Sequence, residues 1–295
     1  MLKVVKCYVW TRAVKINKIG HSVKECILFY FKNRLILKQR YFIELAYNGT
    51  RFHGWQIQPK SKSIQEELQR ALSTICREHI AVTGAGRTDT GVHASYYVAH
   101  FDSEKEQLDD AQFVYKMNRF LGMDIAIFNI VKVDREAHAR FGAISRTYHY
   151  FITQQKDPFA LETAWYNSRS LNVDRMNEAC RILFDFEDFT SFSKLHTDVK
   201  TNNCKIYQAE WIRNGQQLKF VVKADRFLRN MVRAIVGTLV EVGLGKLTID
   251  DFRRVIETQD RGAAGVSVPA CGLFLTDIEY PEAVFKRTVI PDQSN

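Results

Sequence analysis

The sequence lacks the features that mark several classes of protein. It has no uncharged apolar run of about 18 residues, so no membrane-spanning helix is predicted. Its six cysteines are scattered and form no Cys-x-x-Cys pair, which argues against a zinc site and a disulfide framework. With 46% hydrophobic and 25% charged residues, the composition is typical of a globular protein. We therefore expect a cytoplasmic protein with reduced thiols and no metal.

An excess of positive charge is confined to the N-terminus. Residues 1–40 contain ten of the 42 Lys and Arg residues but one of the 33 Asp and Glu residues, and the rest of the chain has 32 of each. Any nucleic-acid surface on the rest of the chain must therefore be a local patch. Residues 1–40 are interpreted as a basic extension that is either dispensable or an arm attracted to RNA phosphates.

Hydrophobic periodicity predicts mixed secondary structure from residue 41 onward. Alternation predicts strands, a Ser63–Glu66 capping box and helical spacing predict a helix that follows residue 63, and residues 213–216 predict a type I′ hairpin turn. The predicted strands are 41–47, 96–101, 125–133, 146–152, 205–212, 217–223 and 272–280, and the later helices are 109–120, 172–184, 227–242 and 248–257. Without strict βαβ alternation, an α+β fold with antiparallel sheet is favoured.

Residues 84–94, GAGRTDTGVHA, are the most informative segment. Glycine costs stability wherever its conformational freedom is unused, so the three glycines around Asp89 indicate a close approach to this backbone. Four functional interpretations compete with a purely structural one. A dinucleotide-binding loop would need a glycine at position 89 and a following helix, and a Walker A loop would need Gly-Lys-Ser/Thr.

The triplet at residues 89–91, DTG, also occurs in aspartic proteases. Those enzymes need two aspartates that share a proton, and the chain has no second Asp-Thr/Ser-Gly triplet. A purely structural role remains open, in which Asp89 caps backbone amides of its own turn.

The fourth interpretation is a resemblance. Residues 86–94 resemble the motif of the TruA family of tRNA pseudouridine synthases, and further family motifs follow the same order along residues 41–281. These are YNGTRFHGWQ at 47–56, SIQEEL at 63–68, HARF at 138–141, RTYHY at 146–150, DFTSF at 188–192, FLRNMVR at 227–233 and GLFL at 272–275.

The resemblance implies an α+β fold of two similar halves. Their mixed or antiparallel sheets join into one extended sheet, with helices on one side and the active-site cleft between the halves. Residues 41–145 would carry the Asp loop, residues 146–281 the Tyr and Arg of the site, and residues 282–295 a tail.

The resemblance also implies the activity, which is isomerisation of uridines 38, 39 and 40 of the tRNA anticodon stem-loop to pseudouridine. It implies no cofactor, tRNA as partner and a homodimer. A non-catalytic RNA-binding protein and a pseudouridine synthase acting on other RNA are the alternatives.

By the same resemblance, Asp89 is the catalytic carboxylate and Arg233 lies against it, while Tyr148 stacks on the target uracil. Arg87 and Leu273 would also contact the substrate. An ionised carboxylate is needed beside the ribose and base, and a nearby arginine favours the charged form. Asp89 could add to C1′, add to C6 or remove a sugar proton.

Residue spacing adds two expectations. Arg226, Arg229 and Arg233 are placed on one face of the predicted 227–242 helix and its start, which predicts an anion opposite them. Basic patches should grip RNA phosphates beyond the active site. Their candidate residues are His138, Arg140, Lys194, His196, Lys200 and Lys205.

Overall fold

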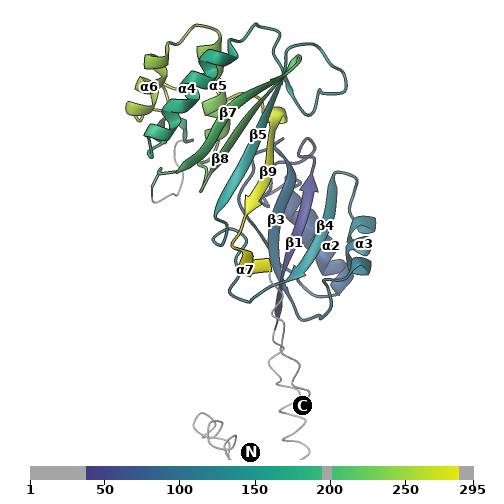
Figure 1. The fold of residues 1–295 in the computed structure, drawn as a ribbon. Helices are drawn as coiled ribbons and strands as arrows, with labels where there is room; N and C mark the ends of the chain where they lie inside the picture. Colours follow the sequence, from purple (N-terminus) through teal and green to yellow (C-terminus); the bar gives the residue numbers. More distant parts are fainter. Residues whose placement is uncertain (1–37, 195–200, 286–295) are drawn as a thin grey trace, which may run out of the picture. The chain divides into compact units, whose positions relative to one another are not determined.

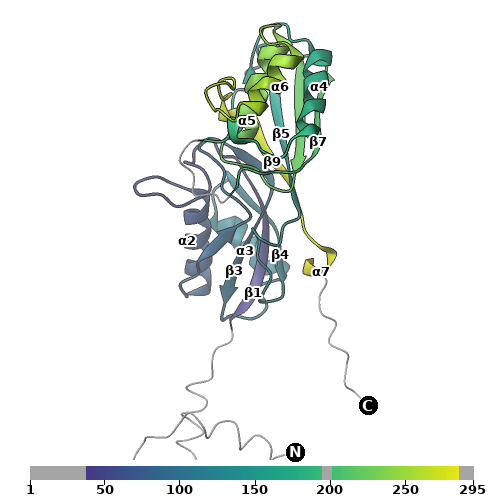
Figure 2. The ribbon, with the colours of Figure 1, turned by 90° about the vertical axis from the view of Figure 1, so that its left-hand side faces the viewer.

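The computed structural model describes residues 38–194 and 201–285 (Figures 1 and 2). The predicted basic extension lies outside this part of the chain except for its last three residues, and His196, Lys200 and most of the predicted tail also lie outside it. The strands form one nine-stranded sheet in the order β4-β1-β3-β9-β5-β8-β7, with β2 paired to β3 and β6 paired to β5.

The N-terminal half is an antiparallel sheet with two helices. In Figure 2, the first helix lies against one face of its strands. Its elements are β1 (Gln39–Tyr47), α2 (Ile64–Cys76), β2 (Val82–Gly84), β3 (His93–Ser103), α3 (Ala111–Phe120) and β4 (Ile125–Lys132).

The C-terminal half is built around four strands joined by antiparallel pairing in the order β9-β5-β8-β7, and its helices α4, α5 and α6 pack together on one side of them (Figure 1). Its strands are β5 (Ser145–Thr153), β6 (Trp165–Tyr166), β7 (Ile206–Asn214), β8 (Gln217–Ala224) and β9 (Leu273–Glu279). Its helices are α4 (Val173–Ile182), α5 (Met231–Gly243), α6 (Ile249–Glu257), α7 (Glu282–Phe285) and the short 3₁₀ turns η1 (Leu183–Asp185), η2 (Thr190–Phe192) and η3 (Ala270–Gly272).

Strand β9 joins the two halves into a single sheet. It pairs in parallel with β3 through His93–Phe274 and Ala94–Leu275, and antiparallel with β5 on its other edge. In Figure 1 it is the yellow arrow between β3 and β5. The predicted α+β class with a joined, mixed sheet is confirmed.

Side-chain caps explain why four helices begin where the sequence predicts. Ser63, Asp110, Asn172 and Thr248 each accept a hydrogen bond from a backbone amide of the first turn, as N-cap residues do. In α2 the Glu66 amide donates to the Ser63 hydroxyl, which is one of the two bonds of a capping box. Both bonds of a capping box are formed in α6, between Thr248 and Asp251. Local sequence therefore sets these boundaries.

Two sequence predictions are wrong in detail. The helix expected from residue 227 starts at Met231, because Asn230 adopts a left-handed backbone with φ of 67°. Arg226 and Arg229 therefore precede the helix and do not share a helical face with Arg233. In the hairpin, Asn214 pairs with Gln217, so the two-residue loop is Gly215-Gln216. Only Gly215 of this loop has a positive φ, which does not match a type I′ turn.

The interior consists of two hydrophobic clusters. One is formed by residues between 150 and 273 with Val92, and the other by residues between 41 and 139 with the end of β9. Tyr148 is partly buried and packs against both clusters. The residues that meet at Tyr148 therefore come from both halves. Over residues 38–194 and 201–285, no helix is long and apolar enough to cross a membrane.

Candidate active site

The Asp89 loop is interleaved with the turn that follows β1. The amide of Trp55 donates to the Thr88 carbonyl at 3.2 Å, and the amide of Gly91 donates to the Phe52 carbonyl at 3.3 Å. A Cβ on Gly54 would lie 2.3 Å from the Thr88 oxygen, and Gly54 also has φ of +85°. The segment that closely approaches the backbone of this loop is therefore the turn after β1, which belongs to the same chain.

Buried polar contacts fix the residues on either side of Asp89. The Thr88 hydroxyl hydrogen-bonds the Tyr47 hydroxyl at 2.9 Å. On the other side, the Gly49 amide donates to His93 Nδ1 at 3.1 Å, and burial lowers the pKa of His93. A neutral imidazole with an unprotonated Nδ1 suits that bond. Asp89 thus lies between two anchored residues.

The Asp89 carboxylate faces two arginines. Its Oδ1 lies 3.6 Å from Arg229 Nε, and its Oδ2 lies 4.0 Å from Arg233 Nη1. Arg233 is oriented by a hydrogen bond of 2.6 Å from its Nε to the Val268 carbonyl. At an effective dielectric constant of about 20, opposite charges at about 4 Å attract by roughly 4 kcal/mol before exposure is considered. The predicted Asp89–Arg233 pair is present, and Arg229 joins it from the turn before α5.

The structural interpretation of Asp89 finds no support in these contacts. Within the described residues, its side chain accepts no hydrogen bond from a backbone amide, whereas Asp110 caps α3 in that way. The Asp89 side chain is 29% exposed, so its oxygens remain open to a ligand. An anchored carboxylate that is charge-paired but uncapped is suited to chemistry.

Tyr148 projects from β5 beside this carboxylate. Its ring meets the edge of Phe227 with centroids 5.1 Å apart. Burial raises the pKa of Tyr148 to about 12, with Arg146 opposing the shift and the Asp89 charge adding to it. Tyr148 is therefore a neutral phenol at neutral pH, with a ring available for stacking. Tyr150, two residues on, is buried and donates to the Pro269 carbonyl at 2.8 Å.

Other predicted substrate residues are placed differently. Arg87 is exposed and forms no ion pair with another described residue. Leu273 is 6% exposed, belongs to the C-terminal cluster and lies opposite Tyr150 in the sheet. Substrate contact by either residue stays a prediction.

The predicted RNA-binding residues do not form one group. His138 and Arg140 lie in the connection between β4 and β5, whereas the exposed Lys194 follows η2 and its amide donates to the Arg229 carbonyl. Lys205 precedes β7 and places its ammonium group 5.9 Å from the Tyr207 ring. His196 and Lys200 are outside the described residues.

Arg146 is the residue whose importance the sequence did not reveal. Its Nη1 donates to the carbonyls of Ala143 and Asp225, and its Nη2 to those of Ala85 and Arg140. Burial lowers the pKa of Arg146, and no described carboxylate pairs with it. The available signal was its position two residues before Tyr148, on the same face of a strand.

Fold and site together define a class of protein. It is an α+β protein of two halves with one mixed sheet, in which a charge-paired carboxylate lies near a neutral phenol where two hydrophobic clusters meet. Among the described residues, no group of three or more His, Cys, Asp and Glu side chains could hold a metal ion.

Comparison with known proteins makes the identification specific. A family model described as tRNA pseudouridine synthase matches residues 45–142 and 179–281. The chain is 56% identical to tRNA pseudouridine synthase A of Parabacteroides distasonis over 247 residues, which is 84% of this chain and 98% of the relative. Identity to tRNA pseudouridine synthase A of Francisella tularensis subsp. novicida is 39% over 254 residues, 85% of this chain and 98% of the relative. The chain belongs to the tRNA pseudouridine synthase family, a family of isomerases.

Proposed function

We propose that this protein isomerises uridine to pseudouridine in tRNA, at positions 38, 39 and 40 of the anticodon stem-loop, with Asp89 as the catalytic carboxylate. The observation that carries the proposal is the uncapped Asp89 carboxylate between Arg229 and Arg233 in a chain of this family.

The reaction rearranges one nucleoside without any net addition. The bond between uracil N1 and ribose C1′ breaks, the uracil rotates, and C5 bonds to C1′. C5 then loses its proton and N1 takes one up. Asp89 acts beside C1′ and C6 as a carboxylate that faces the guanidinium groups of Arg229 and Arg233.

Tyr148 supports the everted uracil. Extruding a nucleotide costs a few kcal/mol, and stacking on an aromatic ring returns roughly 1 to 3 kcal/mol per base. Its phenol keeps its proton at neutral pH because burial raises its pKa to about 12. In this proposal Tyr148 stacks on the base and relays the C5 proton. Arg87 holds the RNA backbone or fills the vacated stack in the same proposal.

The decisive experiment replaces Asp89 with asparagine. Asp89→Asn keeps the size of the side chain but removes its charge, so conversion of uridine in a purified tRNA transcript under single-turnover conditions should be abolished. Affinity for tRNA should stay within about tenfold of wild type, because the substitution leaves both arginines and the Tyr148 ring in place. Asp185→Asn is the matched control, since it removes another carboxylate that pairs with an arginine, Arg253 at 2.6 Å.

The outcomes separate the alternatives. If Asp89→Asn keeps most of the wild-type rate, the catalytic assignment is wrong. If the wild-type protein binds tRNA and converts no uridine, the protein is an RNA-binding protein without turnover. Mapping pseudouridine in the converted transcript and in other RNAs then tests the target positions.

We also propose that the active form is a homodimer with tRNA contacting both subunits. The support for this is the family membership of the chain. Light scattering coupled to size exclusion should give about twice the monomer mass of 34.2 kDa. A monomeric mass at working concentrations would refute the proposal.

A further inference from the structure

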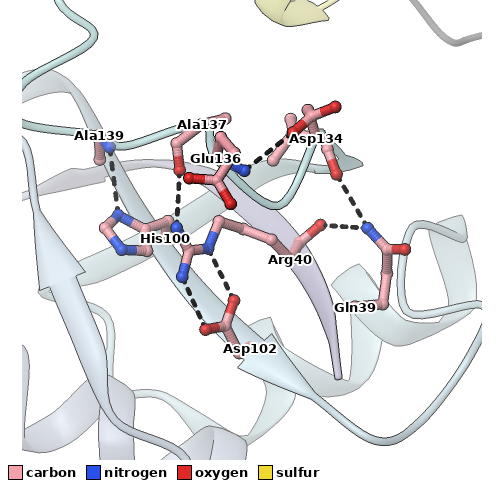
Figure 3. Close-up of polar contacts among 9 residues, drawn as sticks. Gln39, Arg40, His100, Asp102, Asp134, Glu136, Ala137 and Ala139 are labelled. Carbon is pink, nitrogen blue, oxygen red and sulfur yellow. Dashed lines mark hydrogen bonds and ion pairs between the residues drawn. The ribbon is translucent and has the colours of Figure 1, made fainter. Parts of the chain in front are cut away.

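The connection between β4 and β5 is held by side-chain hydrogen bonds to its backbone. Four side chains bind this backbone between residues 137 and 140, three of them from β1, β3 and β5 and one from Tyr280, directly after β9. Arg40 Nη1 donates to the Ala137 carbonyl at 3.0 Å, His100 Nδ1 accepts from the Ala139 amide at 3.1 Å, Tyr280 donates to the Ala139 carbonyl at 2.6 Å, and Arg146 donates to the Arg140 carbonyl at 2.6 Å. Figure 3 shows the first two of these contacts and the Asp102 carboxylate that orients Arg40.

His138 tightens the same turn from within. Its Nδ1 accepts hydrogen bonds from the amides of Arg140 at 3.1 Å and Phe141 at 3.3 Å, and its carbonyl accepts from Gly142 at 2.8 Å. Burial and the charge of Arg40 lower the pKa of His138, which favours the neutral ring that these bonds require. His138 is therefore a turn-forming residue rather than a free cation for RNA phosphates.

This rigid turn presents one large aromatic side chain to solvent. Phe141 is 76% exposed. The His138 ring lies 4.4 Å from the Phe141 ring, and the Arg140 guanidinium lies 5.6 Å from it. Arg140 forms no ion pair within the described residues, so its positive charge stays available beside the ring. An aromatic ring next to an unpaired guanidinium group is an arrangement by which proteins hold single-stranded nucleic acid.

The turn is also coupled to the catalytic loop. Arg146 Nη2 donates both to the Arg140 carbonyl and to the Ala85 carbonyl at 3.3 Å. One nitrogen thus holds the residue next to Phe141 and a residue four positions before Asp89. The position of the turn that carries Phe141 is therefore tied to the segment that leads into the Asp89 loop.

We propose that Phe141 is a stacking platform for an unpaired base of the RNA substrate, next to the everted uridine, and that Arg140 holds the phosphate of that nucleotide. The proposal rests on the proposed function, because it assigns a second nucleotide site to the same enzyme. RNA is favoured over an apolar protein partner because the Arg140 guanidinium lies beside a single exposed ring.

The test compares variants of Phe141 in filter binding of a tRNA transcript, with the single-turnover rate measured on the same samples. Phe141→Ala should weaken binding roughly 5- to 150-fold, the range that corresponds to a stack of about 1 to 3 kcal/mol. Phe141→Trp should bind as tightly as wild type. Phe141→Leu should bind as weakly as Phe141→Ala, because leucine is apolar but has no π face. Phe128→Ala on β4, which removes another exposed ring, is the matched control.

The salt dependence of binding separates the stacking role of Phe141 from the phosphate contact of Arg140. Phe141→Ala should leave the slope of binding against salt unchanged, whereas Arg140→Gln should reduce it by about one phosphate equivalent. Thermal unfolding should be unaffected by Phe141→Ala, since the ring is exposed. Wild-type affinity in Phe141→Leu, or equal effects of Phe141→Ala and Phe128→Ala, would overturn the platform. Absence of conversion by the wild-type protein would instead refute the proposed function.

Discussion

Two aspartates in this protein are paired with arginine in different ways. Asp102 receives two hydrogen bonds from Arg40, at 2.7 and 2.8 Å, and the pKa of Asp102 is lowered by this pairing. Asp89 is 3.6 and 4.0 Å from its two arginines, with no direct hydrogen bond to either. The first geometry uses the carboxylate to hold structure, whereas the second supplies charge and leaves the oxygens available.

Unequal effects are expected from the two arginines of the site. Arg233 is 21% exposed and fixed by Val268, whereas Arg229 is 58% exposed. Arg233→Gln should slow single-turnover conversion by roughly 10- to 100-fold, because a shielded pair loses more than a solvated one. Arg229→Gln should cost less than about tenfold.

Arg233→Lys distinguishes charge from orientation. Lysine keeps the positive charge but lacks the planar guanidinium, in which Nε donates to the Val268 carbonyl while Nη1 faces Asp89. An intermediate rate is expected for this variant. If Arg229→Gln is slower than Arg233→Gln, the roles assigned to the two arginines are reversed.

At the scale of elements, helix starts were predictable where a side chain marks them. Ser63, Asp110, Asn172 and Thr248 are caps whose effect is local, so sequence suffices. The start of α5 was not predictable from local pattern, since apolar residues continue on both sides of Asn230. There the tertiary structure imposes a left-handed residue, and the chain turns so that Arg229 reaches Asp89.

The turn after β4 should make the free energy of unfolding depend on pH. Burial, together with the charges of Arg40 and His138, lowers the pKa of His100 from 6.5 to about 4. Between these values the unfolded chain binds a proton that the folded chain excludes, so the free energy of unfolding falls as pH falls. From pH 7 to pH 5 this residue should contribute a loss of about 2 kcal/mol.

His100→Asn tests that contribution. Asparagine can accept the Ala139 amide hydrogen bond but does not titrate in this range. Urea unfolding at pH 7 and pH 5 should show a smaller loss of stability in the variant than in wild type. An equal loss in both proteins would place the acid sensitivity at other residues.

At the scale of the whole molecule, the sequence predicted the fold class and the pairing of Asp89 with Arg233 through the family resemblance. Its strands and helices were recognisable from their hydrophobic periodicity, because the buried residues of each element recur at regular spacing within one segment of the chain. The parallel contact of β3 with β9 joins segments about 180 residues apart through two residue pairs, and no local pattern encodes it. The same limit hid Arg146, whose four acceptors come from three separate segments.

Arg146 ties the Asp89 loop, the turn that carries Phe141 and the end of β8 to one planar group. These are bonds from a guanidinium to neutral carbonyl oxygens, so dissolved ions compete with them far less than with attraction to phosphates. Added electrolyte should therefore leave the spacing of these three segments unchanged.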